Sequence, residues 1–128
     1  MNKSCRRSMS IGISLVFWLI ISGSIVFSAE VKEGVASWYG GGEKLNKYTA
    51  NGDVFNPEAF MCASWHYEFG TDLRVTNLAN GKSIFVRCND RGPSRKYPER
   101  IIDLTKAAFQ QIADLRVGLI NVTVEVIE

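Results

Sequence analysis

The chain has few of the residues that build metal centres or thiol and imidazole active sites. Its 128 residues include three cysteines and a single histidine, His66. Metal sites in proteins need several His, Cys or carboxylate ligands together, and no close ligand pair accompanies His66. A Cys–His nucleophilic pair also needs a third group that orients the imidazole, and the sequence offers none. We therefore expect no metal and no cofactor.

The sequence also lacks an excess of charge of either sign. Fifteen Lys and Arg stand against thirteen Asp and Glu, a formal net charge of +2. Three of the basic residues, Lys3, Arg6 and Arg7, lie at the N-terminus, and the remainder carries twelve Lys and Arg against the thirteen acids. Because nucleic acids and anionic lipids are bound through clustered positive charge, this balance argues against both as partners.

One long apolar run is present, Ile11–Phe27, and the small residues Ser28 and Ala29 follow it. A basic start, an apolar middle and a small-residue end are typical of a secretory signal peptide, so residues 1–29 are predicted to be removed. The alternative is an uncleaved membrane anchor, since the run approaches spanning length. Ser24 stands where a lipid-anchored bacterial protein would carry cysteine, so no lipid anchor is expected. The mature protein is predicted to be periplasmic or secreted.

Residues 30–128 contain no internal repeat, low-complexity tract or domain boundary, and they suffice for one small domain. Runs of β-branched and aromatic residues separated by turn residues predict strands at 33–40, 73–76, 83–88 and 119–127, and residues 100–104 form a further short apolar run. Short helices are expected at 56–63 and at 106–114, the second capped by Thr105 or Asp103. Short strands without a βαβ rhythm predict a compact β-barrel.

The residue best placed for chemistry is Asp90. Asn80-Gly81 supplies a tight hairpin turn, and the strand that follows runs into the segment Asn89–Pro93, which reads NDRGP. Gly92-Pro93 ends the strand, so Asp90 is expected at a strand end, held by a rigid scaffold and open to a cleft. The alternative is that Asp90 only accepts hydrogen bonds from nearby turn amides.

Other polar and aromatic residues are weaker candidates. Asp53 follows the Asn51-Gly52 bend and, taken alone, is equally well a solvated turn residue. Trp38 and Tyr39 are adjacent, so on a strand they face opposite sides, one toward the core and one free to meet a sugar ring. The three rings of Trp65–Tyr67 lie in one loop, where they pack the fold or line a carbohydrate groove.

Cys62 and Cys88 are the cysteines that remain after residues 1–29 are removed. An oxidising compartment favours a disulfide between them. Cys88 shares strand parity with Ile84 and Val86, so its side chain should face the core. The alternative is that both are buried free thiols that pack as small apolar groups.

Seven motifs occur in one order along the chain, and together they carry a family resemblance. They are Gly34-Val35-Ala36-Ser37-Trp38-Tyr39-Gly40, Thr49-Ala50-Asn51-Gly52-Asp53, Phe69-Gly70-Thr71, Val75-Thr76-Asn77-Leu78, Asn80-Gly81-Lys82-Ser83, Asn89-Asp90-Arg91-Gly92-Pro93 and Arg100-Ile101-Ile102-Asp103-Leu104. The chain resembles the double-psi β-barrel domain of the rare lipoprotein A family of endolytic peptidoglycan transglycosylases, with expansins and barwin-type proteins as more distant relatives. The resemblance covers essentially the whole mature chain. It implies a mainly β fold, a single six-stranded double-psi β-barrel with one or two short helices.

The resemblance also implies a set of cleft residues. The family has an acid after the Asn-Gly bend, a second acid three positions on, a histidine in the next segment, and the aspartate of NDRGP. By position these fall on Asp53, Asn56, Ser64 and Asp90, so two of the four differ in type. Asp90 is then the catalytic acid/base, and Asp53 shapes the field or holds a sugar hydroxyl. Substrate contacts are expected from Tyr39, Thr49, Asn56, Ser64, Trp65, His66 and Arg91.

Three functions are compatible with these observations. The first is a lytic transglycosylase that cleaves peptidoglycan glycan strands and leaves an anhydro-sugar product. The second is a non-catalytic, expansin-like module that binds glycan or loosens the wall, and the third is a structural or interaction domain that uses the barrel as a scaffold. We expect peptidoglycan glycan strands as the partner, no stable membrane anchor after cleavage, and a monomer.

Overall fold

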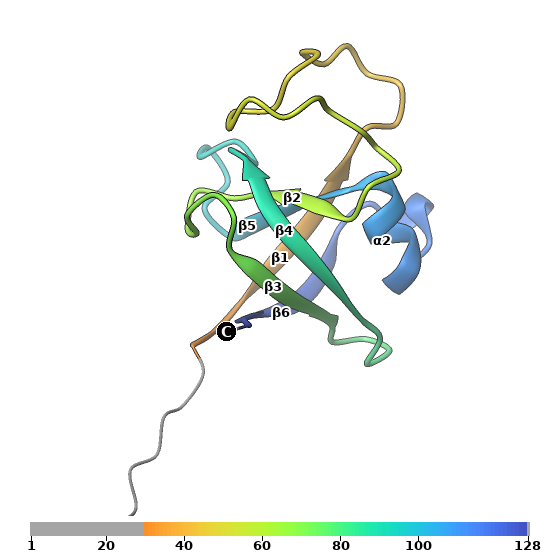
Figure 1. Ribbon diagram of the computed structural model, residues 1–128. Helices are drawn as coiled ribbons and strands as arrows, with labels where there is room; N and C mark the ends of the chain where they lie inside the picture. Colours follow the sequence, from red (N-terminus) through yellow and green to blue (C-terminus); the bar gives the residue numbers. More distant parts are fainter. Residues whose placement is uncertain (1–29, 128) are drawn as a thin grey trace, which may run out of the picture.

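Six strands close into a barrel in the computed structural model, which describes residues 30–127 (Figure 1). The strands are β1 Val31–Tyr39, β2 Met61–Ala63, β3 Asp72–Asn77, β4 Ser83–Asp90, β5 Arg100–Thr105 and β6 Ile120–Val126. One α-helix, α2 Lys106–Ile112, and one short 3-10 helix, η1 Leu115–Val117, lie between β5 and β6. The predicted mainly β barrel with one or two short helices is therefore confirmed.

The barrel is mixed and closed, with neighbours in the order β1-β5-β2-β4-β3-β6. The pairs β1–β5 and β2–β4 are parallel, and the other pairs are antiparallel. Alternate residues of each strand point inward, as Leu73 and Val75 of β3 and Val122 and Val124 of β6 do. Burial of these side chains, with Phe109 of α2, drives closure because it removes apolar surface from water. Within residues 30–127, closure also leaves no unpaired edge in this sheet.

Strand β2 is the element that the sequence pattern misses. A helix was predicted over 56–63, but the segment makes turns and then the three-residue strand Met61–Ala63 between β4 and β5. Three residues are too few to show a period of two, and Cys62 and Ala63 are both buried. The tertiary pairing of β2 with two long strands overrides the helical propensity of this segment.

The two ends of α2 are fixed by residues far away in sequence. Thr105 is the N-cap residue, but its hydroxyl donates to the carbonyl of Ala59 at 2.5 Å, and Asp103 lies inside β5. The predicted side-chain cap from either residue is therefore wrong. At the other end, the amides of Asn77 and Asn80 donate to the carbonyl of Ile112 at 2.8 and 2.9 Å. The β3–β4 hairpin thereby satisfies a carbonyl that the helix cannot.

Cys62 and Cys88 are free thiols in the structure, so the predicted disulfide is wrong and the alternative of buried thiols holds. They are register partners on the parallel strands β2 and β4, and both are fully buried. The Cys88 sulfur is within 3.7 Å of the Tyr67 carbonyl and accepts from Arg91 Nη1 at 3.6 Å. A hydrogen bond between the two thiols lowers the pKa of Cys88 and raises the pKa of Cys62, which burial raises further.

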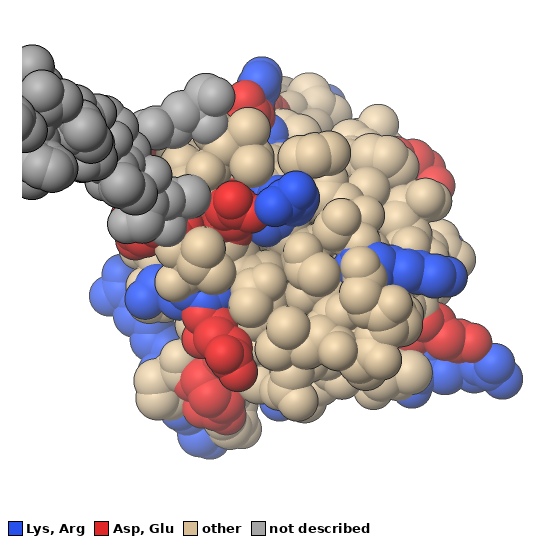
Figure 2. Space-filling model, turned by 90° about the horizontal axis from the view of Figure 1, so that it is seen from below, with Lys and Arg blue, Asp and Glu red and all other residues tan. Residues whose placement is uncertain are grey.

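The predicted signal peptide, residues 1–29, lies outside the described residues. Within residues 30–127, no helix is both long and apolar enough to cross a membrane. On the face seen in Figure 2, at the end of the barrel away from the 40–60 loop, acidic and basic side chains are interspersed. That mixed surface agrees with the near-neutral composition of this part of the chain.

Candidate active site

The candidate site lies at the end of the barrel where β1 and β4 terminate. There the long segment 40–60 arches over the two strand ends (Figure 1). It folds back on itself through the Tyr48–Val54 bridge and the hydrogen bond from Thr49 N to Asp53 O at 2.8 Å. A cavity of about 350 Å³ opens beneath it, and these residues line it: Tyr39, Leu45, Asn46, Tyr48, Thr49, Ala50, Phe55, Asp90 and Arg91.

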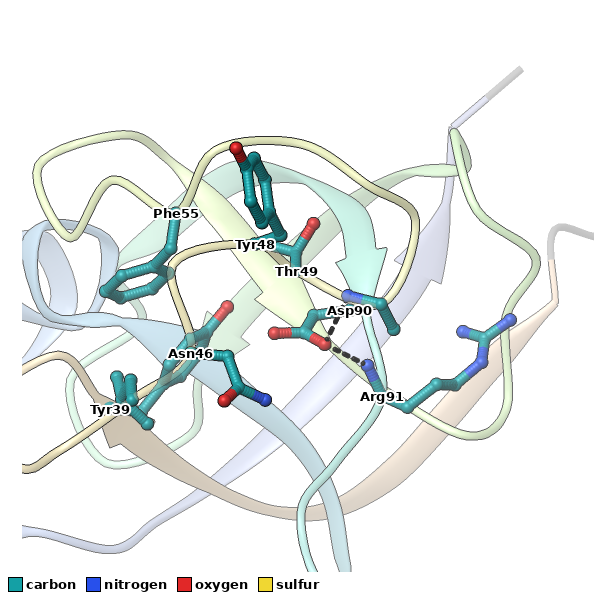
Figure 3. Close-up of a pocket in the computed structure, with 9 residues that line it drawn as sticks. Tyr39, Asn46, Tyr48, Thr49, Phe55, Asp90 and Arg91 are labelled. Atoms are coloured by element: carbon teal, nitrogen blue, oxygen red, sulfur yellow. Dashed lines mark hydrogen bonds between the residues drawn. The ribbon is translucent and has the colours of Figure 1, made fainter.

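Asp90 is held in this cleft through one of its two carboxylate oxygens. Oδ1 accepts hydrogen bonds from the backbone amides of Ala50 and Arg91, each at 2.9 Å. The first of these bonds ties the 40–60 segment to the end of β4. The second carboxylate oxygen points into the cleft, toward the side where Asn46 and Tyr39 lie (Figure 3). One oxygen fixes the geometry, and the other is free to meet a ligand.

An irregularity in the β2–β4 pairing sets the direction of Asp90. Cys62 pairs with Cys88, but the next residue of β2, Ala63, pairs with Asp90. Asn89 is therefore an extra residue on β4, the arrangement of a β-bulge, which turns the side chains that follow. The Asn89 amide is buried, and its Nδ2 donates to Asp53 Oδ2 at 3.3 Å. The bulge thus joins the strand end to the Asn51–Asp53 turn.

Asp103 is a second carboxylate close to this strand end. It lies on β5, opposite Ser37 of β1 and Ala63 of β2, and its Oδ1 accepts from the Ser37 hydroxyl at 3.1 Å. Burial raises the pKa of Asp103 to about 6, and the negative charges of Glu43 and Asp90 act in the same direction. Asp103 is not among the residues that line the cleft. Asp103 can therefore change the electrostatic potential in the cleft, which depends on whether its carboxyl group is charged or protonated.

A second hollow of about 270 Å³ adjoins the cleft and shares Tyr39 and Phe55 with it. The two rings are 5.3 Å apart between centroids and form the boundary between the two spaces. The second hollow is further lined by Asp53, Val54, Asn56, Ala59, Met61, Asn89 and Thr105. Asp53 is thus near the site, but in the hollow next to that of Asp90.

Six of the residues predicted from the sequence gather around these two spaces: Tyr39, Thr49, Asp53, Asn56, Asp90 and Arg91. Tyr39 and Trp38 do face opposite ways, since Trp38 packs against Phe109 of α2 with its indole N–H on the carbonyl of Leu115. The guanidinium of Arg91 is partly committed to the fold, because Nη1 donates to the carbonyls of Ser64 and Tyr67.

The other three predicted residues lie elsewhere. Ser64 is fully buried, and its hydroxyl donates to the carbonyl of Ile101 at 2.9 Å. Trp65 is exposed, with its indole N–H on the carbonyl of Pro93 and the Arg95 guanidinium over its ring at 3.7 Å. His66 lines a separate hollow beside Lys32, and burial lowers its pKa. None of these three side chains lines the cleft or the second hollow.

Sequence reasoning missed Asp103 and Asn89 as site residues. Asp103 lies in a short apolar run that is typical of a buried strand. Acidic residues are rarely buried without a reason, so an acid inside such a run could have indicated a functional residue. Asn89 sits in the NDRGP motif, but its importance comes from a bulge that only strand pairing reveals. Asn46, Tyr48 and Phe55 line the cleft because the 40–60 segment folds over it, and no local pattern predicts that.

The fold and the cleft define a class, the small six-stranded mixed β-barrels with a carboxylate at the rim under a long loop. Residues 31–124 match the model of the lytic transglycolase family. The probable endolytic peptidoglycan transglycosylase RlpA of Synechocystis sp. is 43% identical over 98 residues, which are 77% of this chain and 30% of that protein. The chain belongs to the lytic transglycolase family, as the resemblance predicted.

Further comparisons agree on the family and the fold. The endolytic peptidoglycan transglycosylase RlpA of Campylobacter jejuni is 42% identical over 81% of this chain and 37% of that protein. This chain therefore spans only about a third of the length of these relatives. A solved Clavibacter michiganensis expansin, 20% identical, superimposes with a TM-score of 0.61 over 77% of this chain and 51% of that one. At that identity the likeness shows the barrel fold alone.

Proposed function

We propose that the chain is a lytic transglycosylase domain that cleaves the glycan strands of peptidoglycan. The observation that carries the proposal is the geometry of Asp90, whose one oxygen is fixed by two backbone amides while the other faces the cleft. Family membership supports the reaction class, and the relatives are named for that activity. A cleft of about 350 Å³ with polar and aromatic walls suits a sugar ring.

The reaction needs one group that gives and then takes a proton. Asp90, when protonated, donates its proton to the oxygen of the scissile glycosidic bond as the bond from C1 to that oxygen breaks. The C6 hydroxyl of the same sugar forms a new bond to C1, and its proton passes to the Asp90 carboxylate. The products are a free sugar hydroxyl on one fragment and a 1,6-anhydro sugar on the other. Asp90 returns to its starting state, and no water is consumed.

Asp103 has a positioning role in this scheme. Burial raises the pKa of Asp103 to about 6, so near this pH it exchanges between a neutral and a charged form close to the cleft. Asp53 lines the adjoining hollow, and we assign it to a sugar hydroxyl rather than to the scissile bond.

A non-catalytic glycan-binding module is the second candidate. The observation that favours it is that Asp90 is the one carboxylate lining the cleft within residues 30–127. A single carboxylate holds a sugar hydroxyl as readily as it transfers a proton. The positions at which the resemblance implies an acid and a histidine, moreover, carry Asn56 and Ser64, and Ser64 is buried away from the cleft.

One experiment separates the two candidates. The protein, purified as it is recovered from the cell, is incubated with isolated sacculi, with and without stem peptides, and the soluble fraction is analysed by mass spectrometry. Anhydro-sugar fragments released by the wild type and absent with Asp90→Asn support the transglycosylase. Sacculus binding without soluble fragments supports the binding module and contradicts cleavage.

We further propose that the protein is exported, with residues 1–29 removed, and acts as a monomer in the periplasm or outside the cell. The basic, apolar and small-residue order of the N-terminal segment supports export. The measurement is the intact mass of the protein recovered from the cell envelope fraction, together with its mass in solution. A mature chain that begins at Glu30, or at Ala29 where the cut follows Ser28, is expected, and a full-length chain retained in the membrane would contradict removal.

A further inference from the structure

The arginines of residues 30–127 differ in what their guanidinium groups bind. Three of the six donate through two nitrogens to one carboxylate group, namely Arg74, Arg87 and Arg116. Arg91 donates to two backbone carbonyls. The guanidinium groups of Arg95 and Arg100 have no hydrogen-bond or ion-pair partner within the part of the chain that the structure describes. Two arginines thus keep their N–H donors unused.

Both of these arginines lie over aromatic rings. The Cζ atom of Arg95 is 3.7 Å from the centroid of the Trp65 ring, and that of Arg100 is 4.6 Å from the centroid of Tyr97. A separation as short as 3.7 Å is that of two stacked planar groups, so the N–H groups of Arg95 remain available along its edge. Trp65 is itself fixed, since its indole N–H donates to the carbonyl of Pro93 at 2.8 Å. The guanidinium of Arg95 is therefore held in place before any ligand arrives, which lowers the entropy cost of binding.

The segments that carry these pairs, 64–70 and 91–100, lie side by side at the end of the barrel that bears the cleft (Figure 1). Arg91 connects the cleft to this face. It lines the cleft next to Asp90, while its guanidinium lies over the Phe69 ring at 3.9 Å and points away from the Asp90 carboxylate (Figure 3). The face formed by the two segments thus begins one residue beyond Asp90.

This face has a local excess of positive charge that the overall composition conceals. Its two segments contain two acids, Glu68 and Glu99, and these four cations: Arg91, Arg95, Lys96 and Arg100. Residues 30–128 as a whole have twelve Lys and Arg against thirteen acids. Arg95 and Lys96 are exposed. An exposed guanidinium edge next to other cations matches a planar anion that accepts two parallel hydrogen bonds, which is the geometry of a carboxylate.

We propose that Arg95, with Lys96 and Arg100 beside it, binds a carboxylate group carried by the glycan strand that occupies the Asp90 cleft. The inference rests on the proposed function, because it takes peptidoglycan as the ligand. Alternate sugars of that polymer carry a lactyl ether, whose carboxyl group is either free or extended by a stem peptide with carboxylates of its own. Both sources present the same planar anion. The subsite therefore recognises the substituents of the strand, whereas the cleft receives its sugar ring.

Binding to sacculi with charged or neutral carboxyl groups tests the proposal. Sacculi are used intact or stripped of stem peptides, and half of each preparation is converted to neutral methylamides with carbodiimide and methylamine. Co-sedimentation measures the affinity of the protein as recovered from the cell, in the wild type and in Asp90→Asn, which cannot cleave the polymer. Methylamidation is expected to weaken binding about tenfold, the value of a charge-assisted hydrogen bond. Weakening with stripped sacculi identifies the lactyl carboxylate, and weakening confined to intact sacculi identifies the stem peptide.

Variants assign this charge dependence to Arg95. Arg95→Gln should lower the affinity for untreated sacculi about tenfold and leave the affinity for methylamidated sacculi unchanged. Arg95→Lys keeps the charge without the planar edge and should restore only part of the loss. Trp65→Leu removes the ring under Arg95 without changing the charge and should weaken the same carboxylate-dependent binding. Lys82→Gln, the matched control, removes one exposed charge between β3 and β4 and should leave both affinities unchanged.

The outcomes separate this proposal from the proposed function. Equal affinities for untreated and methylamidated sacculi, no binding to untreated sacculi, or equal losses in Arg95→Gln and Lys82→Gln would each overturn the carboxylate subsite, even if sacculi are cleaved. A methylamide-sensitive affinity that Arg95→Gln weakens, in a protein that releases no fragments from sacculi, upholds the subsite while the proposed catalysis fails.

Discussion

Asp90 and Asp103 flank the same residue of the barrel, since Ala63 of β2 pairs with Asp90 on β4 and with Asp103 on β5. Residues opposite one another on neighbouring strands direct their side chains to the same face, so the two carboxyl groups lie on one side of this strand triplet. The Asn89 bulge brings Asp90 into that alignment. The barrel thus places two partly buried carboxyl groups close together, of which Asp90 lines the cleft and Asp103 does not.

Asp90→Asn should abolish the release of anhydro-sugar fragments from sacculi while the barrel stays folded. The amide is nearly isosteric and retains an oxygen for the two backbone donors, but it cannot give a proton. Loss of a general acid lowers the rate by about a hundredfold or more. Product release is measured by mass spectrometry and folding by circular dichroism. Asp72→Asn, which alters an exposed pair with Arg87, is the control and should keep full activity. Equal rates for wild type and Asp90→Asn would remove Asp90 from the mechanism.

Asp103→Asn should stabilise the protein at neutral pH and have little effect near pH 3.5. The pKa of Asp103 is raised from 3.8 to about 6 in the folded state, so the folded protein binds this proton more tightly than the unfolded chain does. The favourable contribution of Asp103 to the free energy of unfolding is fully present below pH 3.8 and is lost as the pH rises through about 6. The substitution should therefore raise the free energy of unfolding at pH 7.5 by up to about 3 kcal/mol. Urea unfolding at the two pH values measures the difference.

Asp114→Asn is a control of opposite sign for the same experiment. Hydrogen bonds from Arg116 lower the pKa of Asp114 to about 2. Its contribution to stability is present above pH 3.8 and is lost as the pH falls through about 2, so this substitution should weaken the protein slightly at pH 7.5 and not at pH 2. The effect is small because the pair is exposed and screened by salt. A gain in stability for Asp103→Asn that is the same at every pH would contradict the role of the buried charge.

Ser37→Ala should raise the pKa of Asp103 further. The Ser37 hydroxyl donates to Asp103 Oδ1 and stabilises the charged carboxylate, in opposition to the effect of burial. Without it the carboxyl group should hold its proton to a higher pH than in the wild type, where the pKa is about 6. The carboxyl carbon of Asp103, followed by NMR across a pH titration, reports the midpoint. A midpoint that stays in place or moves down would show that the hydrogen bond does not tune this acid.

Asn77→Ala should destabilise the barrel more than Asn80→Ala. Both amides donate to the carbonyl of Ile112 at the end of α2, but Asn77 is buried and its Oδ1 also accepts from the Ala79 amide. Removing it leaves buried polar groups unpaired, which costs about 1–3 kcal/mol. Asn80 is exposed, so water can replace its bond, and its loss should cost less than about 1 kcal/mol. Chemical unfolding of the two variants measures the order, and the reverse order would assign the anchoring of α2 to Asn80.

The sequence by itself determined the features that depend on local pattern. Runs of β-branched and aromatic residues placed four of the strands near their observed positions, and seven ordered motifs identified the family. Gly92-Pro93 after a strand placed Asp90 at a strand end, where the structure has it. Each of these signals is carried by neighbouring residues, whose backbone preferences and side-chain period are fixed by their own chemistry.

Only the tertiary structure decided the features that depend on which strands become neighbours. Met61–Ala63 is a strand because β4 and β5 lie on either side of it, and Cys62 and Cys88 meet there as thiols. His66 is two residues from Ser64, the position at which the resemblance implies a histidine, yet it lines another hollow. Asp103 belongs beside the cleft because closure of the barrel brings its strand next to Ala63. Pairing across a closed barrel is set by the sum of long-range burial and hydrogen bonding, which no short stretch of sequence contains.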